Sequence, residues 1–318
     1  MAMGTLSRRN RIWWIAAIVI PCLAPIALPR FYVYLFSIIL LFGLLATSND
    51  FPLGFGGIYQ FHHAVFYGVG AYGTALTIMK SGLSPWLAFI IGPLIAAFLS
   101  LVMGIICIRL SKLYFGMLQI SVGSLVWVVV YRWYSFTGGD NGIYDITVPD
   151  ILSSYQGAYY FTLIITGISL YLMYRILKSP YGSVLQGIRD NPVRSAMMGI
   201  NVKRHQLLAL IIAGFFAGVA GTLFVVVDNT VFPDMLFWTF SLEATIMCLL
   251  GGWLTFLGPL LGAAIIVVIR TFASTYTVYW GLVLSIIFVL VIFFLPNGIL
   301  GWIQELYQRR TKLAEVKE

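Results

Sequence analysis

Charged side chains are scarce in this sequence. Only 9% of its 318 residues are Asp, Glu, Lys or Arg, whereas a soluble domain usually contains about 25%. The 19 basic and 11 acidic side chains are too few to solvate the surface of a globule of this size. The composition therefore excludes a soluble enzyme, a soluble nucleic-acid-binding domain and a disordered chain.

Cysteines are few, and the common motifs of catalysis are absent. The three cysteines, Cys22, Cys107 and Cys248, lie inside apolar runs, and their spacing fits neither a metal site nor a disulfide framework. The sequence contains no G-x-x-x-x-G-K-S/T, no H-E-x-x-H and no G-x-S-x-G pattern. We therefore expect no catalytic residue, no metal and no bound cofactor. If the function of this protein requires energy, that energy must come from an ion gradient or from another protein.

Long hydrophobic runs, in contrast, fill the sequence, and 60% of its residues are hydrophobic. A helix needs about 20 mainly apolar residues to cross a bilayer. Candidate runs cover roughly residues 12–28, 31–48, 62–80, 85–108, 113–134, 158–176, 207–227, 239–256, 259–272 and 278–295. No clear small-residue cleavage site follows the first run, which favours a retained span over a signal peptide. We expect an all-α integral membrane protein of the cell (inner) membrane, with about ten transmembrane helices in one domain, residues 1–318.

The positions of the basic residues predict the orientation. With ten spans both termini lie on one side, and placing them in the cytoplasm puts fifteen Lys and Arg inside and four outside. Such an excess of cytoplasmic Lys and Arg is typical of inner loops. The net charge of +8 therefore reflects topology rather than nucleic-acid binding. The same assignment makes 177–206 a cytoplasmic loop, 135–157 an extracytoplasmic loop and 296–318 a cytoplasmic tail.

The inner loop contains a short helix marked by its own end signals. Asn191 is a good N-cap, Pro192 suits the first helical position and Gly199 suits the stop. These signals predict a helix over 192–198 with Val193, Ala196 and Met197 on one face. So short a helix is marginal alone in water. It is either a docking element for a cytoplasmic partner or a helix that lies on the membrane surface.

Glycines interrupt the apolar runs at two related places. Gly-Gly-x-x-x-Phe occurs at Gly56-Gly57…Phe61 and again at Gly251-Gly252…Phe256. Paired breaks in the two halves of a transporter are typical of discontinuous helices near the transport path. Close helix packing, as at a G-x-x-x-G pattern, is the alternative. We expect Gly-interrupted or re-entrant segments here.

Ionisable residues inside the predicted spans are candidates for function, because charge is costly in lipid. Glu243 lies about one turn into the eighth span, and His62 and His63 begin the third. Each either lines the path or makes a structural hydrogen bond, and the sequence leaves both open. Arg270 lies near the outer surface, which its side chain can reach.

Several motifs, taken in order, resemble one known family. They include Gly56-Gly57…His63-Ala64…Tyr67-Gly-Val-Gly-Ala-Tyr72, Thr137-Gly-Gly-Asp-Asn-Gly142, Ile188-Arg-Asp-Asn191 followed by Gly199-Ile-Asn201, Leu257-Gly-Pro-Leu-Leu-Gly-Ala263 and Leu295-Pro-Asn-Gly-Ile-Leu-Gly301. Over residues 35 to 301 the chain resembles the permease subunits of ATP-binding-cassette importers for branched-chain amino acids.

The resemblance implies a transport subunit that works by alternating access and is not itself an enzyme. Its implied partners are a second, homologous permease, two cytoplasmic ATPase subunits that bind the ATP, an extracytoplasmic substrate-binding protein and the lipid bilayer. The implied ATPase-coupling residues are Arg189, Asp190, Asn191, Pro192, Val193, Arg194, Met197 and Gly199. The candidate translocation path comprises Gly56, Gly57, His63, Gly70, Glu243, Gly251 and Gly252. The outer residues Gly138, Gly139, Asp140, Asn141 and Gly142 would face the binding protein.

The sequence departs from the family pattern in one segment. His62 occupies a position that is often glycine in the family, and 51–55 is less regular than the usual small-residue turn. Both changes bear on substrate choice. A permease for urea or short amides is therefore an alternative, as is a stand-alone secondary transporter coupled to protons through Glu243 or His63.

Overall fold

The computed structural model is helical throughout the part of the chain that it describes. This part comprises residues 25, 28–110, 112–277, 279, 281–282, 285–286, 288–289, 293 and 298–302. The predicted first span, most of the tenth and nearly all of the tail lie outside the described residues. Within them, β-structure is limited to one isolated bridge, between Ile143 and Val231.

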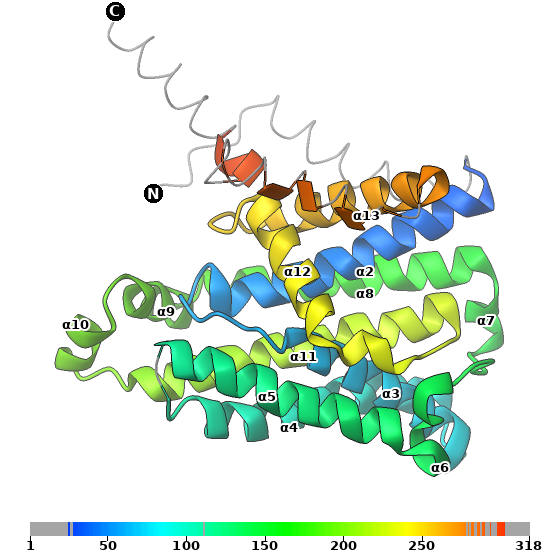
Figure 1. The fold of residues 1–318 in the computed structure, drawn as a ribbon, viewed down its shortest axis with the longest axis horizontal. Helices are drawn as coiled ribbons and strands as arrows, with labels where there is room; N and C mark the ends of the chain where they lie inside the picture. The colour runs from blue at the N-terminus through cyan, green and yellow to red at the C-terminus, as the bar shows by residue number, and fades with distance from the viewer. Residues whose placement is uncertain are drawn as a thin grey trace, which may run out of the picture.

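Among the described residues, six helices are long and apolar enough to cross a membrane. They are α2 (Arg30–Leu53), α4 (Pro85–Cys107), α5 (Lys112–Arg132), α8 (Tyr155–Leu177), α11 (Val202–Asp228) and α13 (Gly258–Tyr276). Figure 1 shows α2, α4, α5, α8 and α11 lying side by side along the long axis of the molecule. The prediction of an all-helical membrane protein is confirmed. The expected number of about ten transmembrane helices stays a prediction.

Two of the expected spans differ from this pattern. The helix α3 (His63–Ser81) is long enough to span a bilayer but is less apolar than the six candidate spans. The helix α12 (Trp238–Gly251) has 14 residues, or about 21 Å of helix, less than the roughly 30 Å of a bilayer core. The predicted span 239–256 was therefore too long, because Gly252 takes φ +121° and ends the helix. Figure 1 shows α12 running across its neighbours rather than along them.

The short elements lie at the two ends of the bundle. At one end are α9 (Pro180–Asp190) and α10 (Pro192–Met197), and we call it the α10 end. At the other are α6 (Tyr134–Thr137) and α7 (Asp150–Ser153), and we call it the α6 end. The 3-10 turns η1 (Gly139–Asn141) and η2 (Pro233–Leu236) complete the described elements.

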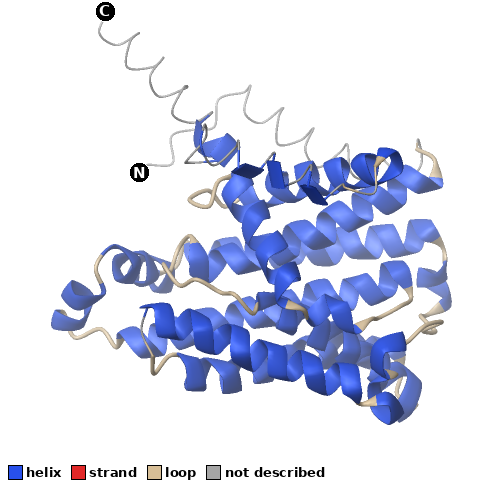
Figure 2. Ribbon diagram, viewed as in Figure 1, coloured by secondary structure: helices blue, strands red, loops and turns tan. Residues whose placement is uncertain are grey.

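The core forms around α11, which packs against α2, α3 and α4. Small residues permit this packing: a Cβ atom on Gly70 would lie 2.5 Å from Cα of Gly218. Gly221 likewise leaves room for the carbonyl oxygen of Tyr67. Backbones thus approach closely at α3 and α11, as is typical of membrane helices. Figure 2 shows a long irregular connection crossing the bundle, the segment from α2 to α3.

Candidate functional site

The predicted short helix is present at the α10 end. It is α10, one residue shorter than expected, and Asn191 caps it by accepting a hydrogen bond from the amide of Arg194 at 2.9 Å. Gly199 takes φ +83° and ends the segment. Because these signals are local, the sequence was sufficient to place the helix.

The apolar side chains of α10 point away from the rest of the chain. Val193 is 63% exposed, Met197 84% and Met198 75%. Ser195 is the buried residue of this helix. An apolar face of this kind at the end of a membrane bundle is typical of an interaction surface.

The preceding helix, α9, was not predicted and anchors α10 to the bundle. Leu185 and Ile188 are buried on its inner face. Tyr181 stacks on His205 at the start of α11 and donates a hydrogen bond to the His205 carbonyl oxygen at 2.9 Å. Burial raises the pKa of the Tyr181 hydroxyl, so that it stays a donor.

Arg189, expected to face a partner, instead lies against the chain itself. Its Nη1 donates to the carbonyl oxygen of Gly54 at 2.7 Å, and its Nη2 lies 3.1 Å from Oδ1 of Asp190. A Cβ atom on Gly57 would lie 2.9 Å from Cγ of Arg189. Gly57 also takes φ +66°, which favours glycine.

The two glycine breaks meet at this same place. The turn after α2 contacts the turn after α12. At this contact the carbonyl oxygen of Trp253 lies so close to Gly54 that a Cβ atom there would collide with it. A Cβ atom on Gly56 would lie 3.2 Å from Leu185 of α9. We call the contact of α9 with the first break, together with the contact of the first break with the second, the glycine junction, and define it by Gly54, Gly56, Gly57, Leu185, Arg189 and Trp253. Sequence alone related the breaks to each other but not to Arg189.

The histidine pair lies deeper, at the start of α3. His63 is fully buried, and its Nε2 lies 2.8 Å from Oγ of Ser48. His62 packs edge-on against Phe66, with ring centroids 4.9 Å apart. Gln119 of α5 accepts a hydrogen bond from the amide of Phe61 at 3.1 Å. These polar groups therefore fix the α2–α3 connection against α5.

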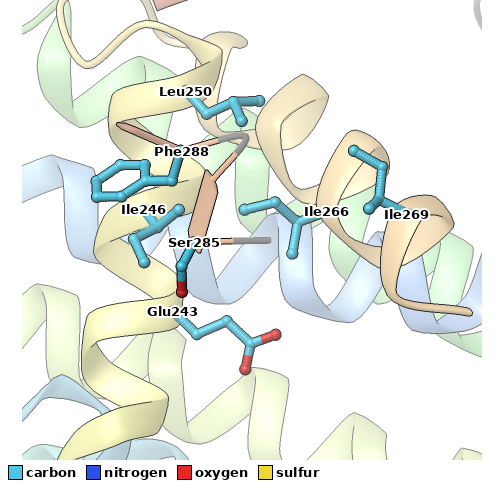
Figure 3. Close-up of a pocket in the computed structure, with 7 residues that line it drawn as sticks. All are labelled: Glu243, Ile246, Leu250, Ile266, Ile269, Ser285 and Phe288. Carbon is cyan, nitrogen blue, oxygen red and sulfur yellow. The ribbon is translucent and has the colours of Figure 1, made fainter. Parts of the chain in front are cut away.

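The remaining candidate path residues lie in helix contacts or an ion pair. Gly70 packs on Gly218, and Gly251 leaves room for the backbone of Gly258. Glu243 pairs with Arg270, with Oε1 and Nη1 3.2 Å apart. Figure 3 shows Glu243 at one edge of a pocket between α12 and α13, which encloses about 80 Å³ and is lined by Ile246, Leu250 and Ile266 among others.

The loop 138–149 is held to a segment that the sequence did not highlight. Ile143 and Val231 exchange two backbone hydrogen bonds of 2.8 Å. Gly138, Gly139 and Gly142 all take positive φ, and Gly142 faces the backbone of Val231 and Phe232. Asp140 and Asn141 are exposed beside them. Paired non-local contacts of this kind leave no periodic signal in a sequence.

Gly142→Ala is expected to destabilise this loop. The change forces a left-handed conformation on alanine, at about 1–2 kcal/mol, and directs its methyl group into Val231. We expect a lower unfolding temperature in detergent. Gly167→Ala is the matched control, because a Cβ atom there meets nothing within 4 Å. Equal stability of the two variants would contradict the prediction.

Comparison with known proteins gives a family for this arrangement. Residues 31–293 match the family model for the permease component of branched-chain amino acid transport systems. The chain belongs to this family. The match spans α2 to α13 and therefore includes the α10 end, the glycine junction and the loop 138–149.

Relatives within the family are similar over most of their length. The permease protein LivM of the high-affinity branched-chain amino acid transport system is 26% identical in Escherichia coli K12 and 25% identical in Salmonella typhimurium LT2, over 92% of this chain and 75% of each relative. A probable branched-chain amino acid transport permease of Methanocaldococcus jannaschii, LivH, is 26% identical over 73% of this chain and 80% of that protein. No solved structure matches the chain.

Proposed function

We propose that this protein is the membrane subunit of an ATP-driven importer that moves branched-chain amino acids by alternating access. The observation that carries the proposal is the family match together with α10, a capped helix whose apolar side chains are exposed at one end of the bundle. As a member of the permease family it is a multi-pass membrane protein and a transport subunit. ATP is bound and hydrolysed by separate chains.

The proposed partners follow from the family and from the two ends of the bundle. The chain is similar both to LivM and to LivH relatives, which supports pairing with a second, homologous permease. One of the two ATPase subunits would dock on α10, and a substrate-binding protein on the loop 138–142. This places the α10 end in the cytoplasm, together with both termini, in a topology of about ten spans.

The glycine junction supplies the route for coupling. Arg189 and Leu185 of α9 contact the turn after α2, and that turn contacts the turn after α12. The glycines bring the Arg189 and Leu185 side chains of α9 against the backbone of the first turn, so movement of α9 is transmitted to that turn and through it to the turn after α12. An ATPase that displaces α10 would thereby shift α2, α3 and α12 around the path.

The proposal is tested by uptake in liposomes. We expect the chain, reconstituted with its second permease, ATPases and binding protein, to take up radiolabelled leucine when ATP is enclosed. A protonophore should leave the rate unchanged. Uptake by the chain alone that a protonophore abolishes would contradict the proposal and support a proton-coupled transporter.

Replacement of Met197 by aspartate is expected to release the ATPases. Met197 is 84% exposed, so the change leaves the fold intact but places a charge in an apolar contact, a loss of about 2–4 kcal/mol in binding. Copurification in mild detergent measures the effect. Ile151→Asp is the control, because Ile151 is 73% exposed at the α6 end. Retention of the ATPases by Met197→Asp would show that α10 is not the docking helix.

A further inference from the structure

Beside the glycine junction lies a buried carboxylate that makes no hydrogen bond with the described residues. Asp50, near the end of α2, has no exposed surface, and neither carboxylate oxygen has a hydrogen-bond partner among the described residues. Buried charged groups are usually paired, because an ion that leaves water loses its hydration. Asp50 is therefore a strong acceptor that this conformation does not use.

Arg189 and Asp50 meet at one glycine. The guanidinium of Arg189 donates to the carbonyl oxygen of Gly54, and a Cβ atom on Gly54 would lie 2.6 Å from Oδ1 of Asp50. The charge of Arg189 acts on the Asp50 carboxylate, yet the ion pair of Arg189 is with Asp190. A larger residue at position 54 would collide with the Asp50 carboxylate and with the carbonyl oxygen of Trp253.

The present partner of Arg189 holds it weakly. The side chain of Asp190 is 69% exposed and that of Arg189 27% exposed. Exposed ion pairs contribute little, since water screens the attraction and both side chains lose freedom. The attraction between Arg189 and a fully buried carboxylate is less screened. Because both groups are already largely buried, little further desolvation opposes their pairing.

We propose that Asp50 is a second partner of Arg189, and that Arg189 exchanges Asp190 for Asp50 when α9 and α10 move during transport. Asp50 is then a positioning residue that ties the coupling segment to α2 in one state of the cycle. The inference rests on the proposed function, because it assigns a role to the movement of α10.

Asp50→Asn tests the exchange in the complete reconstituted importer. We expect uptake to fall at least about tenfold, a typical size for a coupling interaction. The unfolding temperature is expected to rise, because the variant removes a buried carboxyl group that has no hydrogen-bond partner among the described residues. A purely structural Asp50 would instead give a variant that loses stability and uptake together. That result, or normal uptake by Asp50→Asn, would overturn the inference.

A double variant separates the exchange from the proposed function. If Arg189 and Asp50 act as a pair, Asp50→Asn should reduce uptake no further once Arg189→Ala is present, whereas independent roles give additive losses. Thr162→Val is the control for a buried polar change, because the Thr162 hydroxyl bonds only within α8 in the described structure. ATP-dependent uptake by the wild-type importer tests the proposed function separately. If the wild-type importer is active and the losses of the two variants are additive, the exchange is overturned while the proposed function stands.

Discussion

Uptake is expected to fall at least about tenfold when Gly57 is replaced by alanine. Two effects combine at this position. Gly57 takes φ +66°, which costs alanine about 1–2 kcal/mol. The added methyl group would also lie 2.9 Å from Cγ of Arg189 and displace that side chain from Gly54. The change therefore separates α9 from the turn after α2, and ATP-dependent leucine uptake in liposomes measures the loss.

A second glycine with the same backbone strain but without a contact to α9 separates the two effects. Gly82, which follows α3, takes φ +63°, but a Cβ atom there meets nothing within 4 Å. Gly82→Ala therefore carries the same strain without a contact to α9. We expect it to keep most of the uptake. If the two variants transport equally well, the glycine junction has no role in coupling.

Gly70→Ala is expected to prevent correct packing of the bundle. Its methyl group would lie 2.5 Å from Cα and from the carbonyl oxygen of Gly218, and these are backbone atoms of the central helix α11. Because α3 and α11 must move apart along their length, we expect a loss of about 3–5 kcal/mol, the range of severe core substitutions. The yield of monodisperse protein in detergent and its unfolding temperature measure this effect.

Gly167→Ala provides the comparison for that experiment. Gly167 lies in α8, is exposed, and has open space at its Cβ position. Alanine is the better helix former by about 1 kcal/mol, so this variant should be at least as stable as the wild type. A Gly70→Ala protein that unfolds at the wild-type temperature would show that the α3–α11 contact tolerates separation. It would also leave Gly70 available as a residue of the path.

Local signals explain which elements the sequence could predict. Long apolar runs in the sequence predicted α2, α4, α5, α8 and α11. Each of these helices has a continuous hydrophobic surface that is either buried in the bundle or available to lipid. Asn191, Pro192 and Gly199 placed α10 through capping and backbone preference. The same signals did not predict α9, whose sequence contains glycine and polar residues and whose helix is held by contacts with α8, α10 and α11.

Contacts between distant residues explain what the sequence could not predict. Arg189 and Gly54 are 135 positions apart, and Glu243 and Arg270 are 27 apart. Neither pair follows from periodicity, because each depends on how whole helices pack. Asp50 is the exception that a closer search would have found. It is an acidic residue directly after an apolar run, and such residues are candidates for function by default.

The short helix α12 joins two contacts described above, one near each of its ends. Its first residue, Trp238, follows η2 and the segment that pairs with Ile143 of the loop 138–149. Just beyond its last residue, Gly251, Trp253 packs against Gly54. A 14-residue helix bends little over its length. In the proposed importer, a substrate-binding protein on the loop 138–142 and an ATPase on α10 would therefore act on opposite ends of one stiff helix.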